Sequence, residues 1–166
     1  MTFIQQDDLI KEEFKIELKN FFRDYGKELT ESKFTEVKDD EVIFNNGLPI
    51  QPDKKLSKIR ASFNIPENTE IYLVHTASVF SIFGKDKGFA ITEDGIYYRD
   101  DDKKVGIYPW DEFADCYAIT HMGFLQIKSP KGISHSTEFN IKRAKVYSGC
   151  LGILAEIAKK YVGSAE

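Results

Sequence analysis

The sequence is poor in the residues that build disulfide, metal and membrane frameworks. It contains only 2 cysteines and 5 prolines in 166 residues, and no apolar run approaches the ~18 residues of a membrane span. Cys116 and Cys150 are far apart, so no CxxC pair indicates a zinc ribbon or a redox dithiol. The N-terminus lacks the basic and apolar regions of a signal peptide. These absences predict a cytoplasmic protein without a disulfide scaffold.

An excess of positive charge is also missing. The chain carries 23 Lys and Arg against 27 Asp and Glu, and the net charge of −4 divides equally between residues 1–66 and residues 67–166. Proteins that follow a nucleic-acid backbone or an anionic membrane usually carry a basic excess on the binding domain. Nucleic acid and strongly anionic membranes are therefore disfavoured as partners. Aromatic residues, in contrast, are plentiful, with 13 Phe, 8 Tyr and 1 Trp available for a core.

The first 66 residues have a mainly helical pattern. One apolar stripe recurs at spacings of three and four residues: Ile10, Phe14, Leu18, Phe21 and Tyr25. This is the pattern of an amphipathic helix, and Gly26 is a plausible end for it. Residues 42–44 could form a short strand, and Asp53 could cap a second short helix that Pro66 ends. We expect residues 1–66 to form a mainly helical N-terminal extension.

From residue 67 the apolar period changes from 3.6 to 2. Short strands about ten residues apart, joined by Gly- and Asp-containing turns, predict an antiparallel meander. The candidate strands are 70–76, 78–83, 88–92, 95–99, 104–110, 115–121, 123–128 and 133–141. A wide apolar stripe then predicts a helix over about 142–162, followed by a tail at 163–166. The fold class is therefore α+β.

A hairpin followed by a tryptophan segment carries a family resemblance. The two segments are Gly88-Phe89-Ala90-Ile91-Thr92-Glu93-Asp94-Gly95-Ile96-Tyr97-Tyr98-Arg99 and Ile107-Tyr108-Pro109-Trp110-Asp111-Glu112-Phe113. They resemble bacterial pleckstrin-homology-like (PH-like) domains, over about residues 67–162. The resemblance implies a strongly bent antiparallel sheet, or partly open barrel, of about seven strands with a C-terminal capping helix. It also implies a binding or assembly module.

The same resemblance argues against phosphoinositide binding. PH domains that bind inositol phosphates usually place several basic residues on the first two strands and their loop. The segment 72–80 of this chain has no Lys or Arg. Phosphoinositide membranes are therefore disfavoured, and a protein or peptide partner is favoured.

The segment Thr92–Gly95 predicts a tight turn between two strands, because glycine can take a positive φ angle there.

Two sets of residues are candidates for an interaction surface. Phe80, Phe83, Tyr108 and Trp110 lie near predicted strand ends; most such aromatics are core, but any that are exposed together would mark a partner surface. Ser148, Gly152 and Ala155 form a smooth face on the last helix, which favours close approach of another backbone. The approaching element would be the N-terminal helices or, in a homo-oligomer, another subunit.

No catalytic or metal site can be named from spacing. The soft ligands His75, His121 and His135 and the two cysteines lack metal-pair spacing, so we expect no metal or cofactor. Asp100–Asp102 is followed by Lys103 and Lys104 and resembles a solvated turn rather than a calcium loop. The sequence shows no nucleophile, base and orienting group close to one another. The active site of an enzyme, for example a hydrolase, would therefore have to be assembled by tertiary folding.

A basic cluster marks the start of the last helix. Lys142, Arg143 and Lys145 oppose the helix dipole at a cost of about 0.3–1 kcal/mol each, which a docked anion would reverse. The simpler interpretation is that they face water. The main expectation is a non-enzymatic interaction module for a protein or peptide. The alternative is a protein that binds a phosphate-type anion at this cluster.

Overall fold

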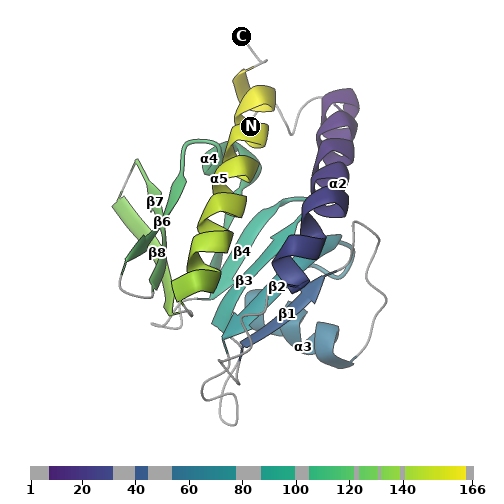
Figure 1. The fold of residues 1–166 in the computed structure, drawn as a ribbon. Helices are drawn as coiled ribbons and strands as arrows, with labels where there is room; N and C mark the ends of the chain where they lie inside the picture. The colour runs from purple at the N-terminus through teal and green to yellow at the C-terminus, as the bar shows by residue number, and fades with distance from the viewer. Residues whose placement is uncertain are drawn as a thin grey trace.

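The computed structural model describes eight segments of the chain: 8–31, 40–44, 54–77, 87–99, 105–121, 124–130, 132–138 and 141–163 (Figure 1). The elements are, in chain order, α2 (Asp8–Glu31), β1 (Asp40–Phe44), α3 (Lys54–Phe63), β2 (Ile71–Ala77), β3 (Lys87–Thr92), β4 (Gly95–Arg99), β5 (Val105–Pro109), α4 (Trp110–Phe113), β6 (Tyr117–His121), β7 (Phe124–Ser129), β8 (Gly132–Glu138) and α5 (Ile141–Gly163). The predicted α+β class is confirmed. None of the described helices is long and apolar enough to cross a membrane.

The strands form two antiparallel sheets. The first sheet has the order β1-β2-β3-β4-β5, and the second has the order β6-β7-β8. Among the described strands no ladder joins the two sheets, so they do not form a closed barrel. The meander predicted from the period of two is confirmed within each sheet, because the described strands pair in chain order from β1 to β5 and from β6 to β8.

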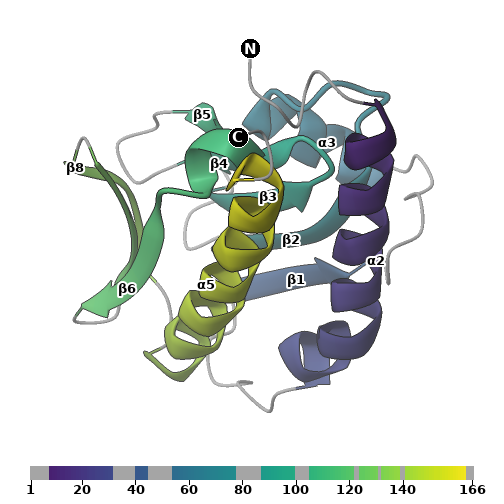
Figure 2. The same ribbon diagram turned by 90° about the horizontal axis from the view of Figure 1, so that it is seen from above.

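Helices cover both faces of the first sheet. Helices α2 and α5 lie side by side on one face, and α3 lies on the other (Figure 2). The larger apolar cluster joins α2, α5 and one sheet face; the smaller one joins Phe63 and Ile65 to the opposite face at Val74 and Ala90. Because both faces of the sheet are covered, residues 71–74 of β2 are fully buried. This explains why the sequence of β2 begins with four consecutive hydrophobic residues instead of an alternating pattern.

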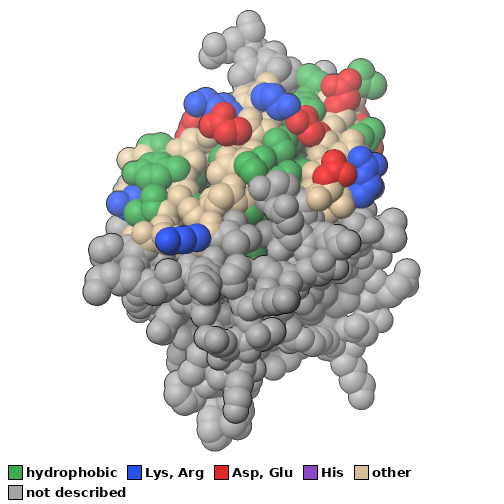
Figure 3. All heavy atoms as spheres, viewed as in Figure 1, with side chains coloured by type: hydrophobic (Ala, Val, Ile, Leu, Met, Phe, Trp, Pro, Cys, Tyr) green, Lys and Arg blue, Asp and Glu red, His purple; other side chains and the backbone are tan. Residues whose placement is uncertain are grey.

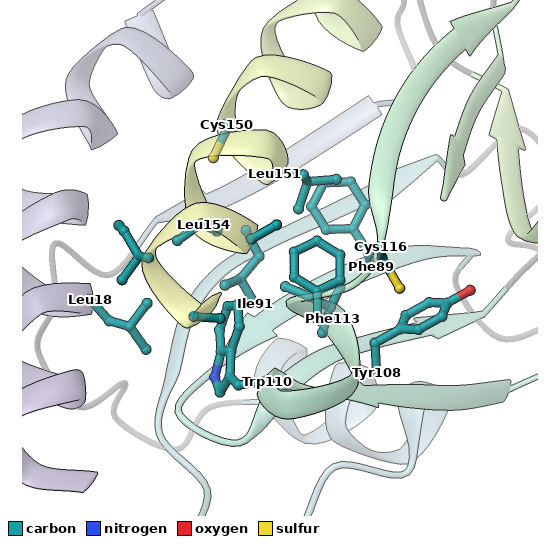
Figure 4. Packing of buried hydrophobic residues seen from close by; sticks show 14 of the residues in the cluster. Leu18, Phe89, Ile91, Tyr108, Trp110, Phe113, Cys116, Cys150, Leu151 and Leu154 are labelled. Carbon is teal, nitrogen blue, oxygen red and sulfur yellow. The ribbon is translucent and has the colours of Figure 1, made fainter. Parts of the chain in front are cut away.

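Side chains from distant segments meet in the larger cluster. Figure 4 shows Leu18 of α2 facing Leu154 of α5, with Trp110 of α4 below them and Phe113 of α4 to the right. The rings of Phe14 and Trp110 meet edge to face with centroids 5.4 Å apart. The aromatic residues thus form a core that residues on both sides of position 66 build together, so position 66 does not separate two cores.

Two helix ends differ from the prediction. Helix α2 continues through Gly26 to Glu31, because one interior glycine costs only about 1 kcal/mol and good helix formers follow it. Helix α3 ends at Phe63 and not at Pro66, because Asn64 takes a left-handed φ of 56°. The N–H of Ile65 then donates to the carbonyl of Arg60 at 2.9 Å, which closes the helix end.

Most of the remaining boundaries follow the prediction closely, but the strand expected over 133–141 ends at Glu138, and Ile141 begins helix α5. The last helix, expected over 142–162, spans Ile141–Gly163. The strand expected over 104–110 stops at Pro109, because Trp110 begins the short helix α4. The strand predicted at 42–44 is confirmed as β1, which pairs with β2. The candidate strand 78–83 and the acidic turn at 100–102 lie outside the described residues.

Candidate functional site

The turn between β3 and β4 is held by one threonine. The hydroxyl of Thr92 donates to the carbonyl of Gly95 at 2.9 Å and accepts the N–H groups of Asp94 at 3.1 Å and Gly95 at 3.2 Å. Gly95 has a φ of +151°, and a Cβ there would lie 2.1 Å from the carbonyl oxygen of Tyr108. The predicted glycine turn is confirmed, and the close neighbouring strand is a second reason for its glycine.

Trp110 ties this turn to the short helix α4. Its indole Nε1–H donates to the carbonyls of Thr92 at 3.2 Å and Glu93 at 3.1 Å. The indole is 2% exposed and packs against Phe14 and Phe113. The backbone of the turn is therefore fixed by the only tryptophan of the chain.

A cleft of about 400 Å³ opens beside this tryptophan. It lies where helix α2, the β3–β4 turn and the junction of β5 with α4 meet. The lining residues are Lys11, Phe14, Glu93, Asp94, Tyr97, Ile107, Pro109, Trp110 and Asp111. Its volume falls within the range of roughly 300–1,000 Å³ that ligand-binding clefts commonly have. We refer to it as the Trp110 cleft.

The Glu93 carboxylate is neutralised at one side of the cleft. One of its oxygens lies 2.8 Å from the ammonium of Lys15, and the other accepts the N–H of Glu70 at 3.1 Å. Burial opposes ionisation, but these hydrogen bonds and the nearby charge of Lys11 outweigh it, so the pKa of Glu93 is lowered. At Lys15 the hydrogen bond to Glu93 raises the pKa of the ammonium group by more than burial lowers it, so the pKa of Lys15 is raised. Both groups are therefore charged near neutral pH.

Two further carboxylates of the cleft have no cationic partner among the described residues. Asp94 accepts a hydrogen bond from the hydroxyl of Thr69 at 3.1 Å, and no described Lys or Arg lies within ion-pair distance of it or of Asp111. Tyr97 is 8% exposed, and burial together with the charge of Asp94 raises its pKa. The cleft thus combines aromatic walls with two carboxylates that form no ion pair with a described residue.

The α2 wall of the cleft is fastened to α5. Glu17 of α2 accepts hydrogen bonds from the ammonium of Lys160 and the hydroxyl of Tyr161. Burial alone would raise the pKa of Glu17, but these two bonds outweigh it and the pKa is lowered. The ring of Tyr161 also meets Phe14 edge to face, with centroids 5.2 Å apart. These contacts fix Phe14, one wall of the cleft, relative to the sheet.

The two described members of the predicted aromatic surface are buried. Tyr108 is 3% exposed and Trp110 is 2% exposed, because helices α2 and α5 cover the face on which they lie. Trp110 nevertheless lines the cleft. Phe80 and Phe83 lie outside the described residues.

The surroundings of the smooth face of α5 also differ from those that the sequence predicts. Ser148 donates to the carbonyl of Ala118 at 3.0 Å, so its neighbour is strand β6 and not the N-terminal helices. A Cβ added at Gly149 or Gly152 would meet no described atom within 4 Å. No close backbone approach therefore requires glycine at either position within the part of the chain that is described.

The basic cluster stays a prediction. Helix α5 begins at Ile141, which places Lys142, Arg143 and Lys145 within its first two turns. Lys145 is exposed, and the side chains of the other two lie outside the described residues. A phosphate titration that left the NMR shifts of residues 141–146 unchanged would contradict an anion site there.

The two thiols are poor nucleophiles. Burial raises the pKa of Cys116 to about 11, with help from the charges of Glu112 and Asp115, and burial raises the pKa of Cys150 to about 12. Both are therefore protonated at neutral pH. Within the described segments, no three His, Cys, Asp or Glu side chains are grouped as a metal site would require.

Comparison of the chain with protein-family models, with curated proteins and with solved structures found no match. The candidate site consequently rests on the geometry alone. The sequence indicated Trp110 as a candidate site residue but none of the four charged lining residues. These are ordinary surface residues in sequence; the pairing of β3, β4 and β5 brings Glu93, Asp94 and Asp111 to the cleft, and the packing of α2 on the sheet adds Lys11.

Proposed function

We propose that this protein is a non-enzymatic interaction module that binds a protein or peptide partner in the Trp110 cleft. The observation that carries the proposal is a cleft with an aromatic and aliphatic lining beside an edge strand. Ile107 and Pro109 line the cleft, and both belong to β5, the last strand in the order of the first sheet. Peptides commonly bind by adding to such an edge and placing side chains in a neighbouring pocket.

The exposed face over α2 and α5 offers less. On the described part of this face, side chains of both charges are interspersed with small apolar areas (Figure 3). The large exposed hydrophobic residues are scattered over three elements: Leu9, Ile16, Tyr117 and Ile153. Single exposed hydrophobic residues are normal on protein surfaces, whereas partner sites are usually continuous apolar patches or clefts. The cleft is therefore the better candidate.

The same cleft supports binding rather than catalysis. Its described lining contains no Cys, His or Ser that could act as a nucleophile. A carboxylic acid that acts as a general acid needs a raised pKa, and the pKa of Glu93 is lowered. Glu93 is thus suited to hold a charge rather than to transfer a proton.

We also infer that the fold is a PH-like architecture with added elements. Strands β2–β8 are seven in number, divide between two antiparallel sheets and precede the long helix α5. This is the order that the resemblance implies. On this view β1 extends the first sheet, while α2 and α3 cover its two faces, and α2 forms one wall of the Trp110 cleft.

Peptide display with a matched pair of variants tests the proposed function. Random peptides would be selected on the immobilised full chain, and synthetic copies would be titrated against the fluorescence of Trp110, the only tryptophan. Lys11→Phe would fill the cleft from α2, whereas Glu13→Phe places the same ring on an exposed position of α2 outside it.

We expect the selected peptides to change the emission of Trp110, and Lys11→Phe to weaken binding by about tenfold or more, or ~1.4 kcal/mol. Glu13→Phe should leave binding unchanged. The proposal is contradicted if no peptide is enriched over the bare support, or if both variants bind selected peptides as the unmodified chain does.

A further inference from the structure

We propose that the Trp110 cleft recognises its peptide partner through a basic side chain, arginine or lysine, held against Asp94 and Asp111 and the rings of Tyr97 and Trp110. This inference rests on the proposed function, because it names the chemistry of the segment that the cleft binds. Charge, aromatic lining and position within the fold each support it.

The charge balance of the cleft leaves room for one cation. Three carboxylates and one ammonium line it, and Lys15 stands just outside. Lys15 pairs with Glu93 at 2.8 Å, the charge of Lys11 lowers the pKa of Glu93, and the charge of Asp94 acts on Lys15 only from beyond ion-pair distance. No described Lys or Arg lies within ion-pair distance of Asp94 or Asp111. A cationic group of a ligand would complete this balance.

The aromatic lining favours the same kind of ligand. Tyr97 and Trp110 line the cleft, so a cation held near the two aspartates has aromatic rings close by. Such rings attract cations, with tryptophan the strongest, and arginine can also stack its planar guanidinium on them. An aliphatic side chain would gain little from the rings beyond burial, and an acidic one would be repelled by the aspartates.

The described residues favour an organic cation over a metal ion. A divalent ion such as calcium requires six to eight oxygen ligands, and magnesium requires near-octahedral coordination. No group of three potential ligands that could hold a metal occurs in the described segments. A guanidinium or ammonium group, in contrast, needs only a few acceptors on one side and tolerates an aromatic wall on the other.

The edge strand explains why the cation belongs to a peptide. A strand added beside β5 would run along the cleft, since Ile107 and Pro109 of β5 line it. Side chains of an added strand alternate between the two faces of the sheet, so one residue in two would point towards the cleft. One basic residue at such a position could reach the aspartates while the peptide backbone pairs with β5.

The test uses peptides selected on the full chain whose binding Lys11→Phe weakens. Each basic residue would be replaced in turn by citrulline, which resembles arginine in shape but carries no charge, and binding would be followed by Trp110 fluorescence at low and high salt. On the protein side, Asp94→Asn and Asp111→Asn remove the two charges. Glu112→Gln is the matched control, because Glu112 is exposed on α4 but does not line the cleft.

We expect one basic residue in each peptide whose change to citrulline weakens binding roughly tenfold, with a similar loss for Asp111→Asn and a larger one for the double variant. Glu112→Gln should change binding less than about twofold, and high salt should weaken binding. Cleft-dependent peptides without Arg or Lys, or citrulline versions that bind equally well, overturn this inference and leave the proposed function standing. Peptides indifferent to Lys11→Phe overturn both.

Discussion

Two segments of this chain contain glycines for which the sequence suggests a structural need, and the structure surrounds them differently. At the β3–β4 turn, Gly95 has a positive φ, and a Cβ would lie 2.1 Å from a backbone oxygen. In α5, Gly149 and Gly152 have an ordinary helical backbone, and a Cβ would meet no described atom within 4 Å. The first glycine is required by its surroundings and the second pair is not. The β3–β4 turn beside the cleft therefore needs glycine, whereas the described surface of α5 has space for a larger side chain.

The largest expected effect is at the turn. Gly95→Ala would force a side chain into a strained backbone conformation and against the carbonyl of Tyr108. We expect a loss of about 3–5 kcal/mol in the free energy of unfolding. Urea denaturation followed by circular dichroism measures it. A loss below about 1 kcal/mol would contradict the rigid turn.

Trp110→Phe tests what holds the turn in place. The phenyl ring keeps part of the packing against Phe14 but cannot donate to the carbonyls of Thr92 and Glu93. We expect a loss of about 2 kcal/mol in stability, measured by the same denaturation. The substitution should accelerate amide hydrogen exchange more at residues 92–95 than in α5. An equal acceleration over the whole chain would mean that Trp110 does not stabilise the turn specifically.

The ion pair at the turn predicts a dependence on pH. The pKa of Glu93 is lowered in the folded chain, so its contribution is complete above the ordinary value of 4.5 and is lost as the pH falls through the folded value. Glu93→Gln should therefore lower stability by no more than about 1 kcal/mol at pH 7. Denaturation at several pH values should show the two proteins converging below pH 4.5. A difference that persists at acid pH would contradict this sign.

The smallest expected effect is in α5 and has the opposite sign. Gly152→Ala adds a methyl group where the described structure leaves space and reduces the entropy of the unfolded chain. We expect a gain of about 0.4–1 kcal/mol in stability, measured by thermal denaturation. A loss of stability would instead support the close approach that the sequence predicts, and it would point to a contact with another subunit.

The sequence predicted the parts of the fold that depend on local pattern. The period of two indicated the strands, the Thr92–Gly95 segment indicated a glycine turn, and the paired apolar residues of the last helix indicated its length. The end of α3 was missed although Asn64 offered a signal, because asparagine adopts the left-handed backbone that ends a helix more readily than most residues. Gly26 was misleading because one interior glycine costs a helix only about 1 kcal/mol and good helix formers follow it in α2.

The Trp110 cleft could not be predicted, because it is a product of tertiary packing. Lys11 and Asp111 are a hundred residues apart and line one cleft only after α2 lies across the sheet. The contacts that hold α2 there, such as Glu17 with Lys160, involve residues that are unremarkable in sequence. Periodicity indicated which face of α2 would be buried but could not indicate what would cover it.

The indole N–H resonance of Trp110 gives the most direct test of the central claim. The chain has one tryptophan, so a nitrogen–proton NMR spectrum contains a single indole signal, from a group that donates to the turn carbonyls. We predict that adding a selected peptide shifts this signal in the unmodified chain and in Glu13→Phe, but not in Lys11→Phe. A peptide that binds while the indole signal stays in place would contradict the account.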